Sequence, residues 1–201
     1  MRLALTVSEA FKLTKLEAAQ RQLSISIRML FSAQDPVAVH TLVGAASIIF
    51  TDLVEKHAPE HSWDKMAQED NDLKPKQYFQ IIRKAQNYLK HARDDHADVL
   101  IFDPSDTEAL IMMAVMNASE ISPMSLEAQV YQLWFLAARY PIECAMEPPF
   151  SDAISLFGDL RETPREERLR VGAQALVQAA LHLGPNNNSS GARLAPAEFG
   201  R

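Results

Sequence analysis

The densest group of side chains that could carry out chemistry in this sequence lies between residues 80 and 96. Arg83, Asn87 and His91 are spaced four residues apart, so on one continuous helix they form a single polar ridge. Histidine titrates near neutral pH and can donate or accept a proton, while a guanidinium or an amide can hold a phosphate. The ridge and the neighbouring Lys90 are therefore the candidate ligand site. An ordinary solvated helix face has the same pattern.

Two patterns resemble metal sites, and both are disfavoured. The run HAPEH at residues 57–61 has the H-x-x-E-H zinc spacing, but Pro59 stops the helix that must place both histidines on one face. A site made from His91, Asp95 and His96 requires a helix that we expect to fray at this point. We therefore expect no metal site, and no cofactor-binding motif is present.

The helices that must position the ridge are marked by capping residues and by apolar residues at helical spacing. Residues 14–17 and 105–108 have the capping-box form, and Asp35 followed by proline begins a helix that reads as the central buried one. The segment 141–162 is punctuated by prolines and holds one short helix near 151–157. The longer predicted helices cover about residues 14–31, 35–57, 75–93, 105–118, 125–140 (with residue 122 as the alternative start) and 163–184.

Two stretches between these helices are expected to be irregular. Residues 58–74 are polar and acidic, and they are interpreted as a loop with one short turn around Trp63 and Met66. Residues 99–102, Val-Leu-Ile-Phe, form a brief apolar run that we expect to be extended and packed under the helices.

Composition limits the classes of protein that this chain can belong to. It has 26 acidic and 20 basic residues and a formal net charge of −6, which disfavours broad electrostatic docking on nucleic acid but allows a local basic patch. The single cysteine, Cys144, cannot form an internal disulfide and is interpreted as a small buried residue. We find no signal peptide and no apolar run near the roughly 20 residues that span a bilayer, so we expect a cytoplasmic protein without membrane contact.

The predicted fold is all-α. Glycine is scarce, with 6 residues, and hairpin turn signals are nearly absent. We expect a single helical bundle of about five to six helices over residues 1–184, with a short extended segment near 98–103. Residues 185–201 have no periodic apolar face and are expected to be a disordered tail.

Three short runs carry a resemblance to known proteins: KLEAAQRQL at 15–23, DPVAVHTL at 35–42 and NYLKHA at 87–92. They resemble an uncharacterised family of small bacterial all-helical proteins, over about residues 14–140. This resemblance implies a helical fold and brings no known activity with it.

Residues 86–91, QNYLKH, also resemble the R-[polar]-x-x-x-H signature of HEPN domains. HEPN domains are helical bundles, many of them dimeric ribonucleases and others binders of nucleotides or partner proteins. The resemblance implies a homodimer in which His91 is the catalytic general acid or base and Asn87 orients a phosphate. Gln86 stands where the family has arginine, and an uncharged amide cannot neutralise a phosphate in the transition state.

The remaining members of the predicted ligand site follow from that substitution. Arg83 or Lys90 would have to supply the positive charge that Gln86 lacks, and Gln86 itself would contact the ligand only as an amide. If the second helix packs against the third, His40 and His91 share a pocket. A hydrogen-bonded core histidine is the other interpretation of His40.

These observations predict two alternative functions. In the first, the chain is a HEPN-like protein of a regulatory or defence system that contacts RNA or a nucleotide through the ridge. Whether it is an enzyme stays open: the activity would be that of a metal-independent ribonuclease, and the glutamine at position 86 argues against it. In the second, the chain is a non-catalytic protein–protein interaction module, in which the ridge is plain surface and an apolar groove receives the partner.

Overall fold

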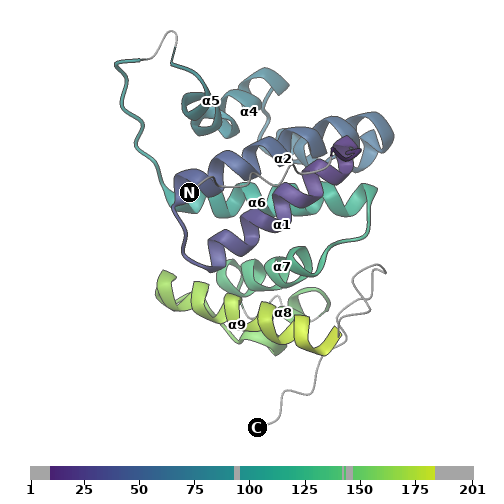
Figure 1. Ribbon diagram of the computed structural model, residues 1–201, viewed down its shortest axis with the longest axis vertical. Helices are drawn as coiled ribbons and strands as arrows, with labels where there is room; N and C mark the ends of the chain where they lie inside the picture. The colour runs from purple at the N-terminus through teal and green to yellow at the C-terminus, as the bar shows by residue number, and fades with distance from the viewer. Residues whose placement is uncertain (1–9, 93–95, 142, 144–146, 184–201) are drawn as a thin grey trace, which may run out of the picture.

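Every regular element is helical in the part of the chain that the computed structural model describes, namely residues 10–92, 96–141, 143 and 147–183 (Figure 1). The all-α prediction is confirmed for these residues, and the predicted number of five or six helices was too low. The elements are α1 (Lys15–Phe31), α2 (Pro36–His57), the 3-10 turn η1 (Pro59–His61), α3 (Trp63–Asp70), α4 (Pro75–Ile82), α5 (Lys84–Lys90), α6 (Pro104–Ile121), α7 (Leu126–Arg139), α8 (Phe150–Phe157) and α9 (Arg165–Leu183). Cys144 and the predicted tail at 185–201 lie outside the described residues.

The core joins two groups of helices. One group is α1, α2 and α6, in which α2 packs against both of the others, and the second is α7 with α8 and α9 packed against it (Figure 1). Phe31 of α1 contacts the fully buried Trp134 of α7 edge to face, with ring centroids 5.4 Å apart. The indole Nε1 of Trp134 donates to the carbonyl of Arg168 at 2.7 Å, which ties α7 to α9.

The starts of α1, α2 and α7 that local capping chemistry predicted are present. Thr14 and Glu17 form a reciprocal capping box at the start of α1. Asp35 Oδ1 accepts from the first-turn N–H groups of α2, and Ser125 caps α7. The start of α6 was predicted wrongly: its N-cap is Asp103, followed by Pro104, and not the box at 105–108.

Residues 58–74, predicted to be a loop, contain the helix α3. Ser62 caps it by accepting from the N–H of Lys65, and its buried residues are the polar Asp64 and Gln68. A helix whose buried side is polar has no apolar stripe in its sequence, and this is why the pattern was missed. The η1 turn separates His57 from His61, so the two histidines do not share one helix face.

The predicted third helix, 75–93, is two helices. Arg83 has φ −97° and ψ 7°, ends α4 and begins α5, and α5 ends at Lys90. The β-branched Ile81 and Ile82 directly precede the break, and such residues favour a helix only weakly. The polar ridge is therefore not carried by one continuous helix.

Residues 98–103 are extended. Contrary to the prediction, they are not packed under the helices. Val99 is 88% exposed and Ile101 is 94% exposed, whereas Leu100 and Phe102 are half-buried. Only alternate side chains face the protein, because successive side chains of an extended segment point in opposite directions.

We predicted from the sequence that no apolar run is long enough to span a bilayer, and helix α2 contradicts this prediction. By length and composition, α2 is the one helix among the described residues that could cross a bilayer. Half of its most apolar stretch is buried against other helices, as in the central helix of a water-soluble protein. Length and composition alone therefore do not decide between the two environments.

Candidate functional site

The predicted ligand residues lie on or next to the pair α4 and α5, which we call the α4–α5 lobe (residues 73–92). In Figure 1 the lobe lies on the far side of α2 from α7, α8 and α9, and α5 packs on α2. The lobe carries no acidic residue, while the rest of the chain has 15 basic and all 26 acidic residues. Its basic residues are Lys74, Lys76, Arg83, Lys84 and Lys90.

The charges of the lobe are available to a ligand. All four lysines are exposed and Arg83 is half-buried. None of the five forms an ion pair with a described residue. The guanidinium of Arg83 lies over the ring of Phe79, 4.1 Å from its centroid, which orients it without neutralising it. Uncompensated cations on one element attract anionic partners.

Asn87, Lys90 and His91 stay together on the exposed end of the lobe. Asn87 and Lys90 lie on α5, and the N–H of His91 donates to the carbonyl of Asn87 at 3.2 Å. His91 has an extended backbone, with φ −131° and ψ 145°, and its side chain is exposed. The exposed histidine and amide are thus close in the chain, but they are not set in a cavity.

Gln86 is not on this surface. Its side chain is 1% exposed and packs on Gly44 of α2, where an added Cβ would lie 1.8 Å from Gln86 Oε1. Neither Oε1 nor Nε2 of Gln86 has a hydrogen-bond partner. The residue at the position of the HEPN arginine is therefore a buried contact between helices and cannot reach a surface ligand.

His40 is also buried and does not meet His91. Its Nδ1 is 3.0 Å from Thr107 Oγ1, and its ring contacts Phe102 edge to face. Its Nε2 is buried without a partner. Desolvation lowers the pKa of His40, partly opposed by the nearby Asp106, so the ring is neutral at pH 7. Of the predicted ligand residues, Arg83, Asn87, Lys90 and His91 are thus accessible, and Gln86 and His40 are not.

A buried carboxylate that sequence reasoning missed holds the lobe at its other end. Asp64 of α3 is 1% exposed and accepts hydrogen bonds from Thr51 Oγ1 at 2.7 Å, Tyr78 Oη at 2.8 Å and Asn117 Nδ2 at 2.8 Å. These donors come from α2, α4 and α6. Burial and the adjacent Asp64 raise the pKa of the Tyr78 phenol, which keeps it a donor. The network joins four helices and is satisfied, as a structural anchor should be.

A second buried carboxylate, Glu108 of α6, ties α6 to α7 and α9. It accepts from Arg139 Nη2 at 3.1 Å and from Arg165 Nε at 2.8 Å, and its backbone carbonyl accepts from Tyr131 Oη at 2.7 Å. Both arginines are more than a third exposed, and Asp103 lies near them. The charges of the two arginines and the two carboxylates cancel, so this cluster offers no net charge to a ligand.

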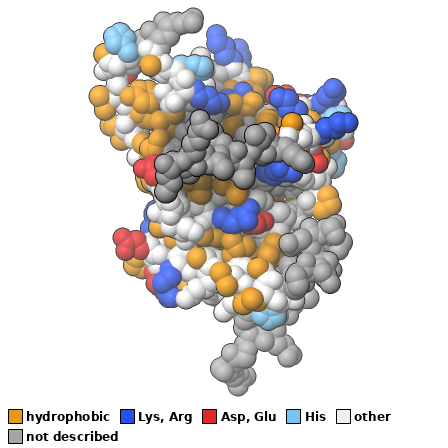
Figure 2. All heavy atoms as spheres, in the orientation of Figure 1, with side chains coloured by type: hydrophobic (Ala, Val, Ile, Leu, Met, Phe, Trp, Pro, Cys, Tyr) orange, Lys and Arg blue, Asp and Glu red, His pale blue; other side chains and the backbone are white. Residues whose placement is uncertain are grey.

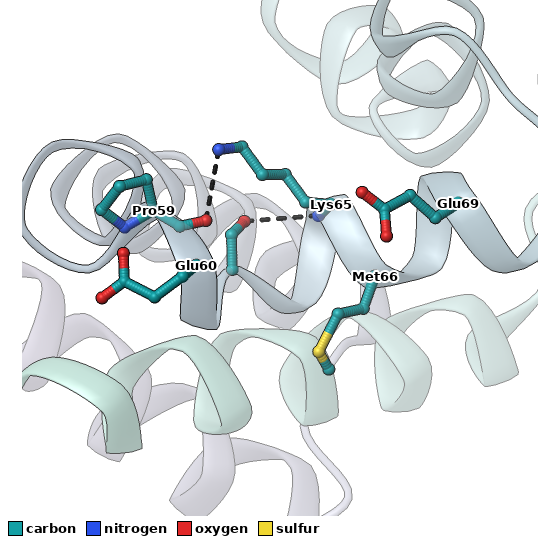
Figure 3. Close-up of a pocket in the computed structure, with 6 residues that line it drawn as sticks. Pro59, Glu60, Lys65, Met66 and Glu69 are labelled. Carbon is teal, nitrogen blue, oxygen red and sulfur yellow. Dashed lines mark hydrogen bonds between the residues drawn. The ribbon is translucent and has the colours of Figure 1, made fainter.

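An open pocket of about 390 Å³ lies beside α3 (Figure 3). Glu60 and Glu69 lie at opposite ends of it, Lys65 is held by the carbonyl of Pro59 at 3.2 Å, and the hydroxyl of Ser62 already caps α3. None of its lining residues presents an unpartnered buried polar atom. The pocket therefore contains no preorganised polar group that would bind a small molecule.

The accessible groups of the α4–α5 lobe can bind phosphate by charge and by hydrogen bonds, but no described side chain is positioned to activate a nucleophile there. No group of three or more metal-binding side chains is found within the described residues. The chain matches no protein-family model, no curated protein and no solved structure.

Proposed function

We propose that this protein binds RNA through the α4–α5 lobe and does not cleave it. The observation that carries the proposal is the separation of charge: five cations and no acid lie in residues 73–92 of a chain whose net charge is −6. A phosphate backbone is attracted to such a surface because binding releases the counterions condensed on it. The acidic remainder of the chain restricts the contact to the lobe.

Binding without cleavage is supported by the geometry around His91. A HEPN-like ribonuclease needs a cation beside its histidine, and Gln86 is both uncharged and buried against Gly44. Lys90 and Asn87 can hold a phosphate near His91, but all three side chains are exposed, and none of them forms a side-chain hydrogen bond with a described residue. Groups of this kind bind phosphate well and position it poorly for reaction.

The test is RNA binding measured by fluorescence anisotropy at several salt concentrations. Lys84→Gln/Lys90→Gln removes two cations of the lobe, and Lys15→Gln/Lys56→Gln removes two exposed lysines from α1 and α2 as the matched control. We expect the lobe variant to lose roughly tenfold or more in affinity and its salt slope to fall by about 1.4, since each phosphate contact contributes about 0.7 for single strands. The control should bind like the wild type.

Equal losses in the two double variants, or no binding by the wild type, would contradict the proposal. His91→Ala separates binding from cleavage, because an exposed polar substitution usually changes stability by under about 0.5 kcal/mol. We expect the RNA to stay intact with wild type and variant alike. Cleavage that His91→Ala abolishes would restore the ribonuclease hypothesis.

A further inference from the structure

Three arginine guanidinium groups of the described chain lie over phenylalanine rings, and the closest of these contacts is in the α4–α5 lobe. The guanidinium carbon of Arg83 is 4.1 Å from the centroid of the Phe79 ring. The corresponding distances are 5.2 Å for Arg21 and 5.7 Å for Arg139, each measured to its own phenylalanine. Because a cation and the face of an aromatic ring attract each other, Phe79 covers one side of the Arg83 guanidinium and holds it in place.

Arg83 differs from the other two arginines in its acidic neighbours. Arg139 forms an ion pair with Glu108 at 3.1 Å, and Arg21 follows Glu17 by one turn of α1. Arg83 forms no ion pair and no side-chain hydrogen bond with a described residue, and its lobe contains no acid. Its charge and its N–H donors are therefore left for a ligand.

The ring under Arg83 is attached to the hydrogen-bond network at α4. Phe79 packs edge to face on Tyr78, with centroids 5.2 Å apart, and the Tyr78 hydroxyl donates to the buried Asp64 at 2.8 Å. Burial and Asp64 raise the pKa of the Tyr78 phenol, and Arg83 is near enough to oppose this rise. The oxygens of Asp64 already accept from three other donors, so this acid does not pair with Arg83. The guanidinium thus lies on the part of the lobe that is held most firmly.

Arg83 is the one planar cation of the lobe, whose other four cations are lysines. Figure 2 shows Lys and Arg side chains beside hydrophobic ones in the upper part of this face, where Figure 1 draws α4 and α5. An ammonium group has no face for a base, whereas a guanidinium can stack on a base and bind phosphate through the N–H groups at its edge. No other described ring lies against Arg83, so the side away from Phe79 is available for stacking.

We propose that the guanidinium of Arg83, held over Phe79, is a stacking platform for an unpaired base, and that the lobe therefore takes single-stranded RNA. This inference rests on the proposed RNA binding and specifies its ligand. In a duplex both faces of a base are covered by its neighbours, whereas a base of a single strand can turn out and stack on a protein group. Lys84 and Asn87 are exposed next to Arg83 and one turn beyond it, where they can contact the flanking phosphates.

The test separates the contribution of the bases from that of the phosphates. Wild-type protein is titrated by fluorescence anisotropy, at one salt concentration, with a labelled strand of about eight adenosines, an abasic strand of the same length and a fully paired RNA duplex. We expect the adenosine strand to bind roughly tenfold or more tightly than the abasic strand, because each stacked base contributes to affinity. The duplex should also bind more weakly than the adenosine strand, although its phosphates are more closely spaced.

Variants of the protein test the same contact from its own side. Arg83→Lys keeps the charge and removes the plane, so it should weaken the adenosine strand roughly tenfold and the abasic strand much less. Phe79→Leu keeps an apolar side chain but removes the ring under the guanidinium, and it should weaken the adenosine strand a few-fold. Arg21→Lys, in an arginine–phenylalanine pair outside the lobe, is the matched control and should bind both strands like the wild type.

Equal affinity of the wild type for the adenosine and abasic strands would overturn the stacking platform and leave RNA binding by charge intact. Tighter binding of the duplex than of the adenosine strand would overturn it too. So would an unchanged affinity of Arg83→Lys, or equal losses in Arg83→Lys and Arg21→Lys, and the pair of Arg83 and Phe79 would then be a structural contact only. No binding of any of the three RNAs would instead remove the RNA-binding proposal, and this inference with it.

Discussion

The two ends of the α4–α5 lobe are attached to the protein in opposite ways. On α4 the buried residue is Tyr78, whose hydroxyl donates to Asp64 within a network that also includes Thr51 and Asn117. On α5 the buried residue is Gln86, whose amide lies on Gly44 with neither polar atom paired. The buried polar groups at the α4 attachment are hydrogen-bonded, whereas the amide at the α5 attachment is buried without a hydrogen-bond partner.

This difference indicates that α4 is held by satisfied hydrogen bonds, whereas the packing of α5 on α2 is opposed by an unsatisfied amide. An unsatisfied buried polar group costs about 1–3 kcal/mol, so the Gln86 contact opposes part of what burial of α5 contributes. Local opening is favoured where a buried contact contributes little net free energy. We therefore expect α5, with its exposed Asn87 and Lys90, to open before α4 does.

The largest effect is expected from breaking the anchor at α4. Asp64→Ala removes the acceptor of three buried donors and should lower the free energy of unfolding by about 3 kcal/mol or more, measured by urea denaturation. Asp52→Ala is the matched control, since Asp52 is an exposed acid on α2, and its effect should be under about 0.5 kcal/mol. Similar losses in the two variants would show that the Asp64 network is not an anchor.

A smaller effect is expected from filling the space that Gln86 occupies. Gly44→Ala places a Cβ 1.8 Å from Gln86 Oε1, and the displaced side chain should cost about 1–3 kcal/mol. In a Gln86→Ala background the same change should cost much less, because the obstacle is gone. Gly172→Ala, which faces Phe31 in the core, is the control and should cost the same in both backgrounds. Additive costs for Gly44 would refute the contact.

Replacing the unpaired amide should strengthen the weak end. Gln86→Met keeps the shape of the side chain and removes both unpaired atoms, so we expect a gain of about 1 kcal/mol and slower amide hydrogen exchange in α5. Exchange in α4 should change little, because Tyr78 and Asp64 are untouched. A loss of stability would mean that the glutamine amide is paired in solution and that α5 is docked as firmly as α4.

The smallest effect concerns His40, one turn before Gly44 on α2. Burial lowers the pKa of His40 in the folded state, so the unfolded chain binds this proton more readily. Stability should fall as the pH drops through the ordinary histidine pKa of about 6.5, and His40→Gln should remove that part of the dependence, about 1 kcal/mol or less. Denaturation at about pH 7.5 and about pH 5.5 measures it. An unchanged dependence in His40→Gln would contradict the assignment.

Local chemistry made much of the fold predictable from the sequence. The starts of α1, α2 and α7 follow from Thr14, Asp35 and Ser125, whose side chains bond to N–H groups two or three residues away. The cations of the lobe were equally visible, because charge separation is a property of composition. These features need no knowledge of tertiary contacts.

Distant contacts decided what the sequence did not reveal. Asp64 finds Asn117 across 53 positions, and only this contact explains why the polar helix α3 is buried. In the sequence Gln86 looks like a surface residue, and only the packing of α5 on Gly44 shows that it is buried. The exposure of Val99 and Ile101 likewise goes with contacts that their neighbours Asp98 and Phe102 make with α5 and α2. Polar burial of this kind has no periodic signal.

Amide hydrogen exchange with and without single-stranded RNA tests the central claim most directly, because it reports on each helix separately. We predict that RNA slows exchange in α5 and the exposed end of the α4–α5 lobe, and that α1, α7 and α9 are unchanged. Protection confined to the helices outside the lobe, or no protection at RNA concentrations that saturate binding, would contradict the assignment of the lobe as the functional surface.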